Sequence, residues 1–387
     1  MKQILTLLLL LMTTPCLMAQ KRELSQARSS IKSGKYDEAE RSMAALLKDS
    51  ANRANKRIYL TRYDAVRHLY EQGNEKLYLK QKYDTAVFFN NTRKLFAIAE
   101  ALDSLDSDYR QKHAAQLNAI RPNLFNGGIY YIRKAKWSDA FDYFEAYIDC
   151  SSQPLFAAYR YDSIDRRMPE AAYWATYCGY KQHDPVLTLR HRKLALRDTT
   201  HHDFTLQFMA EARRWLNDEE LYIATLQEGF RHHPQFAYFF PRLMDAYTSR
   251  GQHEQALALA DSALAVCDTC EFYLFAKSSA LLRLQRYKEC ISYCDRLIAQ
   301  NDSLAEAYFN AGTAYVNLAA GLNPKRERKL LRLAYQNARH YMERYRELMP
   351  EEPSKWAPVL YRIYLNLNMG KQFDEIDRLL NNNTRNK

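Results

Sequence analysis

The sequence predicts an all-α fold, a right-handed superhelical solenoid of antiparallel helix hairpins. Two sets of positions recur every 34 residues in its C-terminal half. They are Ala210, Met244, Ser278 and Gly312 in predicted first helices, and Tyr222, Ala256 and Cys290 in predicted second helices. A fixed period of this length is typical of stacked helical hairpins, which bury their apolar faces only against their neighbours. No stretch alternates apolar and polar residues with β-branched enrichment, so we expect no sheet.

The segment 238–268 shows one predicted hairpin most clearly. Its first helix carries an apolar stripe at the spacing of one helix face, formed by Phe240, Leu243, Met244 and Tyr247. Arg250-Gly251-Gln252 turns the chain, and Gln285-Arg286-Tyr287 does so one period later. The second helix has small residues at its packing positions, namely Ala256, Ala260 and Ala263. Small residues there let the two helices approach closely.

Other segments carry the same marks of aromatic, small and turn residues. They include Leu124, Gly127, Gly128, Tyr131, Trp137, Ala140, Phe144 and Tyr147 in one unit, and Gly34, Tyr36, Ala39, Tyr83 and Ala86 nearer the start. The pattern resembles the tetratricopeptide repeat (TPR) family, and the ending around Gly370 and Phe373 looks like exported bacterial TPR proteins of unassigned function. The resemblance implies a fold and a binding role, but it names no partner.

The sequence predicts a division of the chain into three segments. Residues 1–19 are a predicted signal peptide, residues 20–150 form N-terminal TPR-like hairpins, and residues 151–387 form C-terminal ones in a continuous solenoid. We expect about nine hairpins in all. The least regular stretch runs from Ser151 to Arg167, so a soft boundary is expected there.

The first 19 residues predict export to the periplasm. Lys2 precedes an apolar core from Ile4 to Met12, and Ala19 precedes Gln20 at the expected cleavage point. The core is too short to span a membrane, and no later segment is long and apolar enough to do so. Cys16 raises a lipoprotein alternative, but Pro15 before it fits that signal poorly.

The formal net charge of +11 is concentrated near one predicted helix. Between residues 325 and 346 the basic residues are Lys325, Arg326, Arg328, Lys329, Arg332, Arg339, Arg344 and Arg346, opposed by Glu327 and Glu343. A spacing of seven residues places Lys325, Arg332, Arg339 and Arg346 in one stripe, with Leu330, Leu331, Ala334, Ala338, Tyr341 and Tyr345 on the buried side. The stripe is either a solvated face or a docking surface for an acidic partner, an anionic lipid or an acidic glycan. Export would separate the protein from nucleic acid, so we expect no nucleic-acid partner.

The cysteines predict two environments. Cys290 and Cys294 lie at packing positions of a second helix and are expected to be core thiols. Cys267 and Cys270 lie in a turn between units, where an oxidising compartment would allow a local disulfide. A zinc site that joins the two pairs is geometrically poor, because about ten residues of helix separate them by ~15 Å.

The sequence lacks motifs that carry chemistry. It has no phosphate-binding loop, no zincin motif, no nucleophile elbow and no EF-hand. The pairs His201-His202 and His232-His233 lack any defined ligand spacing, so we expect no metal site and no cofactor. A catalytic carboxylate pair would need side chains that converge in a cleft, which sequence alone does not show.

The leading hypothesis is a non-enzymatic scaffold that binds a protein or peptide in its concave groove. The repeat register assigns to the groove Arg214, Trp215, Tyr238, Asp245, Phe275, Arg283, Phe309 and Asn317, with Arg332 and Arg339 in the basic stripe. Aromatic and Arg side chains are enriched at interface hot spots, although such aromatics also fill gaps between hairpins. The alternative is an envelope-binding or glycan-binding protein, since aromatic faces stack on sugars.

Overall fold

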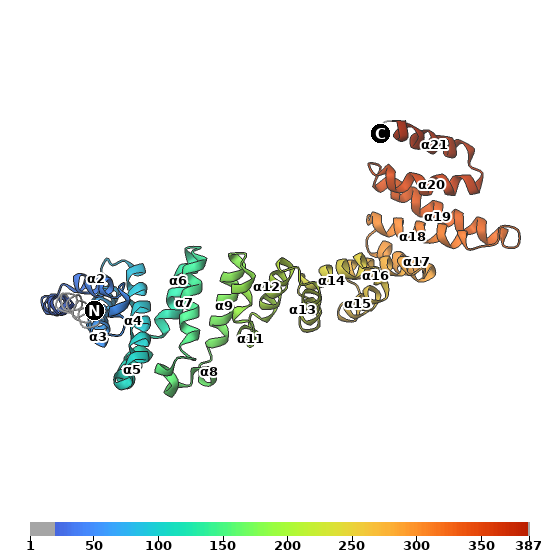
Figure 1. Cartoon of the computed structure of the whole chain (residues 1–387). Coiled ribbons are helices and arrows are strands. Elements are labelled where there is room, and N and C mark those ends of the chain that lie inside the picture. The colour runs from blue at the N-terminus through green and yellow to red at the C-terminus, as the bar shows by residue number, and fades with distance from the viewer. Residues whose placement is uncertain (1–19, 386–387) are drawn as a thin grey trace, which may run out of the picture. The chain divides into compact units, whose positions relative to one another are not determined.

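The protein folds into helices that pack in antiparallel pairs (Figure 1). The structure is a computed structural model that describes residues 20–385, with side chains described as far as residue 381. The predicted signal peptide, residues 1–19, lies outside the described residues. No strand occurs between residues 20 and 385, so the predicted all-α hairpin fold is confirmed.

The chain divides into two compact units, Met1–Glu219 and Glu220–Lys387. The first unit contains a helix over residues 20–32, α2 (Tyr36–Leu46), η1 (Ser50–Asn52), α3 (Lys56–Tyr78), α4 (Thr85–Leu105), η2 (Ser107–Tyr109), α5 (Arg110–Ile120), α6 (Pro122–Arg133), α7 (Trp137–Asp149), η3 (Pro154–Tyr159), α8 (Tyr161–Ile164), α9 (Met168–Lys181), α10 (Pro185–Arg190), α11 (Arg192–Ala195) and α12 (His202–Trp215). The helix 20–32 pairs with α2, α3 with α4, α6 with α7, and α9 with α10 and α11.

The second unit follows the same plan. Its helices are α13 (Glu219–His232), α14 (Phe239–Ser249), α15 (His253–Val266), α16 (Glu271–Arg283), α17 (Tyr287–Gln300), α18 (Ala305–Ala320), α19 (Arg328–Leu348), α20 (Pro353–Leu367) and α21 (Gly370–Arg385). Successive helices from α14 to α21 pack against each other in order. The expected division near residue 150 falls inside the first unit, where α7 packs directly against α9.

Most hairpins turn in the same way, at one residue with positive φ. In the regular part of the chain these residues are Asn217, Gly251 and Gln285, which are themselves one 34-residue period apart. The next N–H then reaches back to close the helix end: Gln252 donates to the Tyr247 carbonyl at 2.8 Å and Arg286 to the Leu281 carbonyl at 2.9 Å. This hydrogen-bond pattern is the Schellman motif, which satisfies carbonyls that the helix leaves unpaired. The hairpin α18–α19 turns differently, through the longer loop 321–327.

Helices within a hairpin touch at small residues. At Gly179 in α9, an added Cβ would lie 2.4 Å from the backbone nitrogen of Thr188 in α10. Backbone cannot move aside as a flexible side chain can, so only glycine fits there. At other contacts between helices the small residue is Ala210 or Ser278, both of which are fully buried. The predicted small positions of the second helices, Ala256 and Cys290, are also buried.

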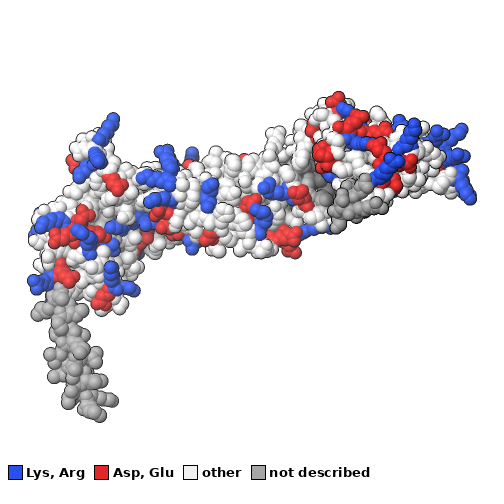
Figure 2. Space-filling model, turned by 90° about the horizontal axis from the view of Figure 1, so that it is seen from above, with Lys and Arg blue, Asp and Glu red and all other residues white. Residues whose placement is uncertain are grey.

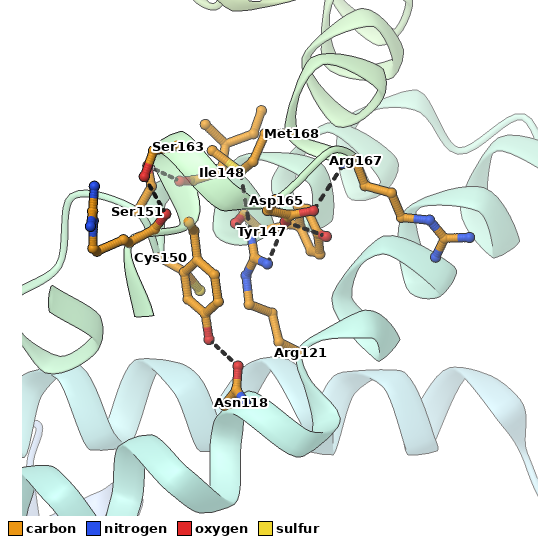
Figure 3. Close-up of polar contacts among 12 residues, drawn as sticks. Asn118, Arg121, Tyr147, Ile148, Cys150, Ser151, Ser163, Asp165, Arg167 and Met168 are labelled. Carbon is orange, nitrogen blue, oxygen red and sulfur yellow. Dashed lines mark hydrogen bonds and ion pairs between the residues drawn. The ribbon is translucent and has the colours of Figure 1, made fainter. Parts of the chain in front are cut away.

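Arg121 anchors the irregular stretch that follows α7 (Figure 3). Its guanidinium carbon lies 3.7 Å from the ring centroid of Tyr147 and 3.8 Å from that of Tyr161. One terminal nitrogen pairs with Asp165 Oδ2 at 2.6 Å, and the other donates to the Tyr147 carbonyl at 2.9 Å. The Tyr147 hydroxyl donates to the same Asp165 oxygen at 2.7 Å. A single buried cation therefore joins the α5–α6 junction, α7 and the segment after α8.

The contacts of Arg121 and Tyr147 keep the Asp165 carboxyl group in its anionic form. Burial by itself would raise the pKa of Asp165, but hydrogen bonds from Tyr147 and Arg121 hold that pKa below its ordinary value. A carboxylate with a lowered pKa stabilises the fold above its unfolded pKa, and that contribution is lost as pH falls through the folded pKa. The cluster therefore contributes fully near neutral pH and weakens in acid.

We predict that Arg121→Met lowers the free energy of unfolding by about 3–5 kcal/mol at pH 7, because it leaves the Asp165 carboxylate buried without a countercharge. The double variant Arg121→Met/Asp165→Asn should recover part of this loss. Urea unfolding followed by circular dichroism measures both. Arg286→Met is the control, since Arg286 and its partner Glu289 are 44% and 52% exposed and neither becomes a buried unpaired charge. A loss at Arg121 no larger than that at Arg286 would contradict the anchoring role.

Candidate functional site

A pocket of about 670 Å³ opens in the first unit between α5 and the first helices of two successive hairpins, the helix 20–32 and α3. Its walls come from the helix 20–32, from α3, and from α5 with the preceding Tyr109, and we call it the N-terminal pocket. Its lining residues are Arg28, Ile31, Lys32, Leu60, Thr61, Tyr63, Asp64, Arg67, Tyr109, Lys112, His113 and Gln116. Because first helices line it, the pocket lies on the kind of surface that the repeat pattern predicts for binding.

The N-terminal pocket carries an excess of positive charge. Arg28, Lys32 and Lys112 are exposed, and none of the three forms an ion pair within the described part of the chain. Arg67 is already engaged, at 2.7 Å from Asp64 and 2.7 Å from Glu71. A concave surface with cations of one sign concentrates the electrostatic potential and attracts anionic groups.

Aromatic rings form the floor of the N-terminal pocket. The ring centroids of Tyr63 and His113 lie 4.3 Å apart, and Tyr109 stacks on His113 with the ring centroids 5.9 Å apart. Burial, with Lys112 nearby, lowers the pKa of His113, so this imidazole is neutral at pH 7. Burial also raises the pKa of Tyr63 to about 12, and its hydroxyl donates to Gln116 Oε1 at 3.1 Å. The floor is therefore uncharged and apolar, whereas the rim is cationic.

The repeat register did not find the N-terminal pocket, because its 34-residue period does not extend into residues 20–150. A signal was nevertheless present in the sequence. Arg28 and Lys32 are four residues apart, as are Tyr63 and Arg67, so each pair shares one helix face. Pairs of basic and aromatic residues on successive first helices would have indicated the same surface.

Two groove residues predicted at the end of the first unit lie on α12. Trp215 is half-buried and stacks on Tyr180 at 5.7 Å and on His183 at 5.2 Å. Arg214 pairs with Glu211 at 2.6 Å. Both side chains thus have intramolecular contacts, and their role in binding stays a prediction.

Phe275 lines a smaller hollow of about 300 Å³ in the second unit. The other residues around it are Glu271, Phe272, Leu304 and Glu306, from the starts of α16 and α18. Phe272 is 47% exposed, so an aromatic face remains open to solvent. This hollow, which we call the Phe275 hollow, has an apolar floor with two carboxylates at its edge.

The other predicted groove residues of the second unit differ in exposure. Asp245 and Arg283 are exposed, Asn317 is half-buried, and Phe309 packs on Tyr345 with ring centroids 5.1 Å apart. Tyr238 requires a correction, because it is only 7% exposed and its ring lies 3.8 Å beneath the guanidinium of Arg242. Its position in the register is that of a groove residue, but neighbouring side chains cover it.

The predicted basic stripe is only partly present. The helix α19 begins at Arg328, so Lys325 lies in the preceding loop instead of on the helix. Arg339 lies 3.2 Å from Glu343, and Arg346 lies 2.5 Å from Glu375 in α21. Of the three stripe residues that lie on α19, Arg332 alone is exposed and without an ion pair in the described residues. Figure 2 shows Lys and Arg side chains gathered where α18 joins α19.

The buried side of α19 also differs from the expectation. Leu330 is 55% exposed, because it lies in the first turn of α19, ahead of the part of the helix that packs against its neighbours. Leu331 and Tyr341 are only half-buried. The residues that the helix does bury are Ala334, Tyr335, Ala338, Met342 and Tyr345.

The cysteines occupy the two environments expected of them. Cys290 and Cys294 are fully buried with sulfur atoms 4.0 Å apart, and the hydrogen bond between them, together with burial, raises the pKa of Cys294. They are core thiols, as predicted. Cys267 is exposed and Cys270 is half-buried, in the turn before α16. Both are free thiols in the structure, and their disulfide stays a prediction.

One pair of carboxyl groups converges in the first unit. Burial, reinforced by the nearby Asp149 carboxylate, raises the pKa of Glu100 to about 7. Perturbed carboxyl groups of this kind are candidates for acid–base chemistry. Glu100 lies on α4 and Asp149 on α7, and neither lines the N-terminal pocket. Ionising Glu100 beside Asp149 therefore lowers the stability of the folded state. The pair does not accompany a substrate site in the N-terminal pocket.

Between residues 20 and 381, no group of three or more His, Cys, Asp or Glu side chains is placed to hold a metal ion. Of the predicted histidine pairs, His201 contacts Asp198 at 2.8 Å and stacks on Tyr173. Among the described helices, none has both the length and the apolar character needed to cross a membrane.

We predict that Glu100→Gln stabilises the first unit, with a gain that is absent below pH 4.5 and grows until about pH 7. The raised pKa means that the folded state favours the protonated acid, so stability is lost as pH rises from 4.5 to about 7. At pH 8 the gain should be about 2 kcal/mol. Thermal unfolding across this pH range tests it, with Glu75→Gln on the exposed face of α3 as control. A pH-independent effect would show that Glu100 is not titrating in this range.

A comparison with solved structures finds matches among proteins with TPR repeats. Yeast Tom70 aligns with 93% of this chain and 90% of its own, at 10% identity and a TM-score of 0.34. A TPR repeats protein from Bacteroides fragilis aligns with 64% of this chain and 98% of its own, at 15% identity and a TM-score of 0.31. The TPR domain of P58(IPK) aligns with 94% of this chain and 98% of its own, at 13% identity and a TM-score of 0.27.

No family model and no curated protein matches the sequence. The TM-scores of the solved structures are low, so the fold assignment rests on the hairpins of the chain itself. Those hairpins have the 34-residue period, the recurrent turn and the small helix-contact residues expected from the sequence. By its fold the chain is a TPR-like protein.

Proposed function

We propose that the chain is a non-enzymatic scaffold whose N-terminal pocket binds an acidic segment of a protein partner. The observation that carries the proposal is a concave surface on successive first helices with unpaired cations at its rim and aromatic rings at its floor. Carboxylates of a partner would meet Arg28, Lys32 and Lys112, and an apolar side chain would cover the floor. Charge-assisted hydrogen bonds of this type are stronger than neutral ones.

The pocket is preformed, which favours recognition of an extended or helical segment. Tyr63 and His113 are each 5% exposed and are fixed by their stacking. The backbone around them belongs to helices, so little conformational entropy would be lost on binding. A cationic rim around an apolar floor also discriminates against basic segments, because a basic segment would bring positive charges close to the positive charges of the rim.

The Phe275 hollow is a second, weaker candidate surface. Its edge carries Glu271 and Glu306, so its electrostatic preference is opposite to that of the N-terminal pocket. A partner segment that places an apolar or basic side chain there would fit. In this hollow the exposed ring of Phe272 lies beside the half-buried groove residue Phe275, which supports the proposal that partners contact more than one hairpin.

Export to the periplasm is part of the proposal and rests on residues 1–19 alone. The charge pattern and the apolar core of this segment support cleavage after Ala19. Mass spectrometry of the protein from cells that make it should find Gln20 at the N-terminus. An acylated Cys16 would instead favour the lipoprotein alternative. The glycan-binding alternative, which would use aromatic residues and the basic stripe, stays a prediction.

We predict that a photoreactive p-benzoylphenylalanine at Gln116 crosslinks a protein partner in cells, because this exposed residue lines the N-terminal pocket. The matched control places the same group at Ala119, which is exposed on α5 outside the pocket. Crosslinks of equal yield at both positions, or at neither, would contradict the proposal.

A second arm of the experiment tests the chemistry with a defined probe, a random copolymer of glutamate and tyrosine. The triple variant Arg28→Gln/Lys32→Gln/Lys112→Gln should weaken binding of the copolymer by about tenfold or more, equivalent to about 1.4 kcal/mol. Arg53→Gln/Arg57→Gln/Lys288→Gln removes the same charge elsewhere and should have little effect. Since all six residues are exposed, the melting temperature should not change. Equal loss in both variants would show that net charge, not the pocket, attracts the probe.

A further inference from the structure

The α18–α19 hairpin ends in a long loop that the other hairpins lack. The first residue that α19 buries is Ala334, although the helix begins at Arg328. Residues 321–333 contain no buried residue, so this end of the hairpin projects from the packed part of the second unit (Figure 1). We call residues 321–333 the basic tip.

The loop of the basic tip is ordered by its own hydrogen bonds. The Asn323 side chain accepts from the backbone N–H groups of Lys325 at 3.0 Å and of Arg326 at 3.1 Å. Glu327 Oε2 accepts from the backbone N–H of Asn323 at 2.7 Å. Glu327, the one acidic residue of the basic tip, is therefore engaged in the hydrogen bonds of the loop. The cations of the tip are exposed to solvent.

Five cations crowd this small surface. They are Lys325, Arg326, Arg328, Lys329 and Arg332, all exposed and none with an ion pair among the described residues. Figure 2 shows this blue cluster at the end of the second unit. Elsewhere on α19 the basic residues are neutralised, as by Glu343 at Arg339 and Glu375 at Arg346. The free positive charge of the helix is therefore confined to its projecting end.

Two large apolar side chains lie among these cations. Leu330 is 55% exposed and Leu333 is 52% exposed, in the first two turns of α19. A projecting surface that combines unpaired cations with exposed leucines can bind a layered surface, one whose outer layer is anionic and whose next layer is apolar. The headgroup layer of an anionic lipid bilayer has this composition.

We propose that the basic tip docks the second unit onto an anionic lipid membrane. The cations contact lipid phosphates, and Leu330 and Leu333 enter the boundary between headgroups and acyl chains. An acidic protein would more readily be held by a concave surface, whereas the tip projects and is convex. The proposal concerns a different unit from the N-terminal pocket, so either can fail without the other.

The test is co-sedimentation of the full chain with vesicles of phosphatidylcholine alone or with phosphatidylglycerol added. We expect binding only to the anionic vesicles, and binding should weaken as salt rises because the attraction is screened. A variant with Lys325, Arg326, Arg328, Lys329 and Arg332 all changed to Gln should bind about a hundredfold more weakly or worse, since each cation near such a surface contributes roughly fivefold.

The matched control removes the same charge from exposed, unpaired cations elsewhere. It changes Arg53, Arg57, Lys288, Arg362 and Lys371 to Gln, and it should retain most of the binding. All variants keep the apolar segment 1–19, so differences between them arise at the changed residues. An equal loss in the control, or wild-type binding to neutral vesicles that matches binding to anionic ones, would overturn the proposal.

The leucines are tested separately. Leu330→Gln/Leu333→Gln should weaken vesicle binding by about tenfold while its salt dependence remains, because the cations are intact. Leu216→Gln/Leu365→Gln changes two leucines of similar exposure elsewhere and should bind as the wild type does. Absence of binding to anionic vesicles would reject the membrane. Polyglutamate binding that is lost in the five-cation tip variant but kept in Arg28→Gln/Lys32→Gln/Lys112→Gln would then assign the tip to an acidic protein.

Discussion

The close contact between the two helices of each hairpin is the constraint on which the rest of the structure depends. A small residue at the contact lets the helices approach, and at Gly179 the neighbour is backbone, which cannot yield. Close pairing makes each hairpin thin, so the first helices of successive hairpins lie near one another. Two of them, the helix 20–32 and α3, supply side chains to one pocket together with α5. The binding surface is therefore a consequence of how tightly the hairpins close.

The repeat pattern was enough to predict the hairpins because their determinants are local. Gly251 and Gln285 lie in turns that the sequence marks at the same 34-residue spacing, and both adopt the positive φ that ends the helix. Ala256 and Cys290 are buried where the period places them. Each of these features depends on residues within one or two turns of the position concerned.

The features that could not be predicted depend on partners distant in the sequence. Arg121 meets Tyr147, Tyr161 and Asp165, and no periodic pattern links these positions. Tyr238 sits at a groove position in the register, but Arg242 covers its ring. Leu330 fits the apolar stripe of α19, yet it lies beyond the packed part of that helix. In each case burial was decided by tertiary neighbours rather than by helix periodicity.

The surfaces of the two units differ in what they attract. The N-terminal pocket is concave, with cations around stacked rings, and suits a defined acidic segment. The basic tip projects and combines cations with leucines, so it suits an extended anionic surface. The Phe275 hollow is bordered by carboxylates. A scaffold with such contrasting surfaces could hold a partner through one unit while the other meets a different surface.

Hydrogen–deuterium exchange of the full chain with the glutamate–tyrosine copolymer tests the central claim most directly, because it reports every helix in one experiment. If the N-terminal pocket is the acidic-segment site, amide protection should increase in the helix 20–32, in α3 and in α5. The helices from α13 to α18 should be unchanged. Protection confined to the second unit, with no change in those three helices, would contradict the account.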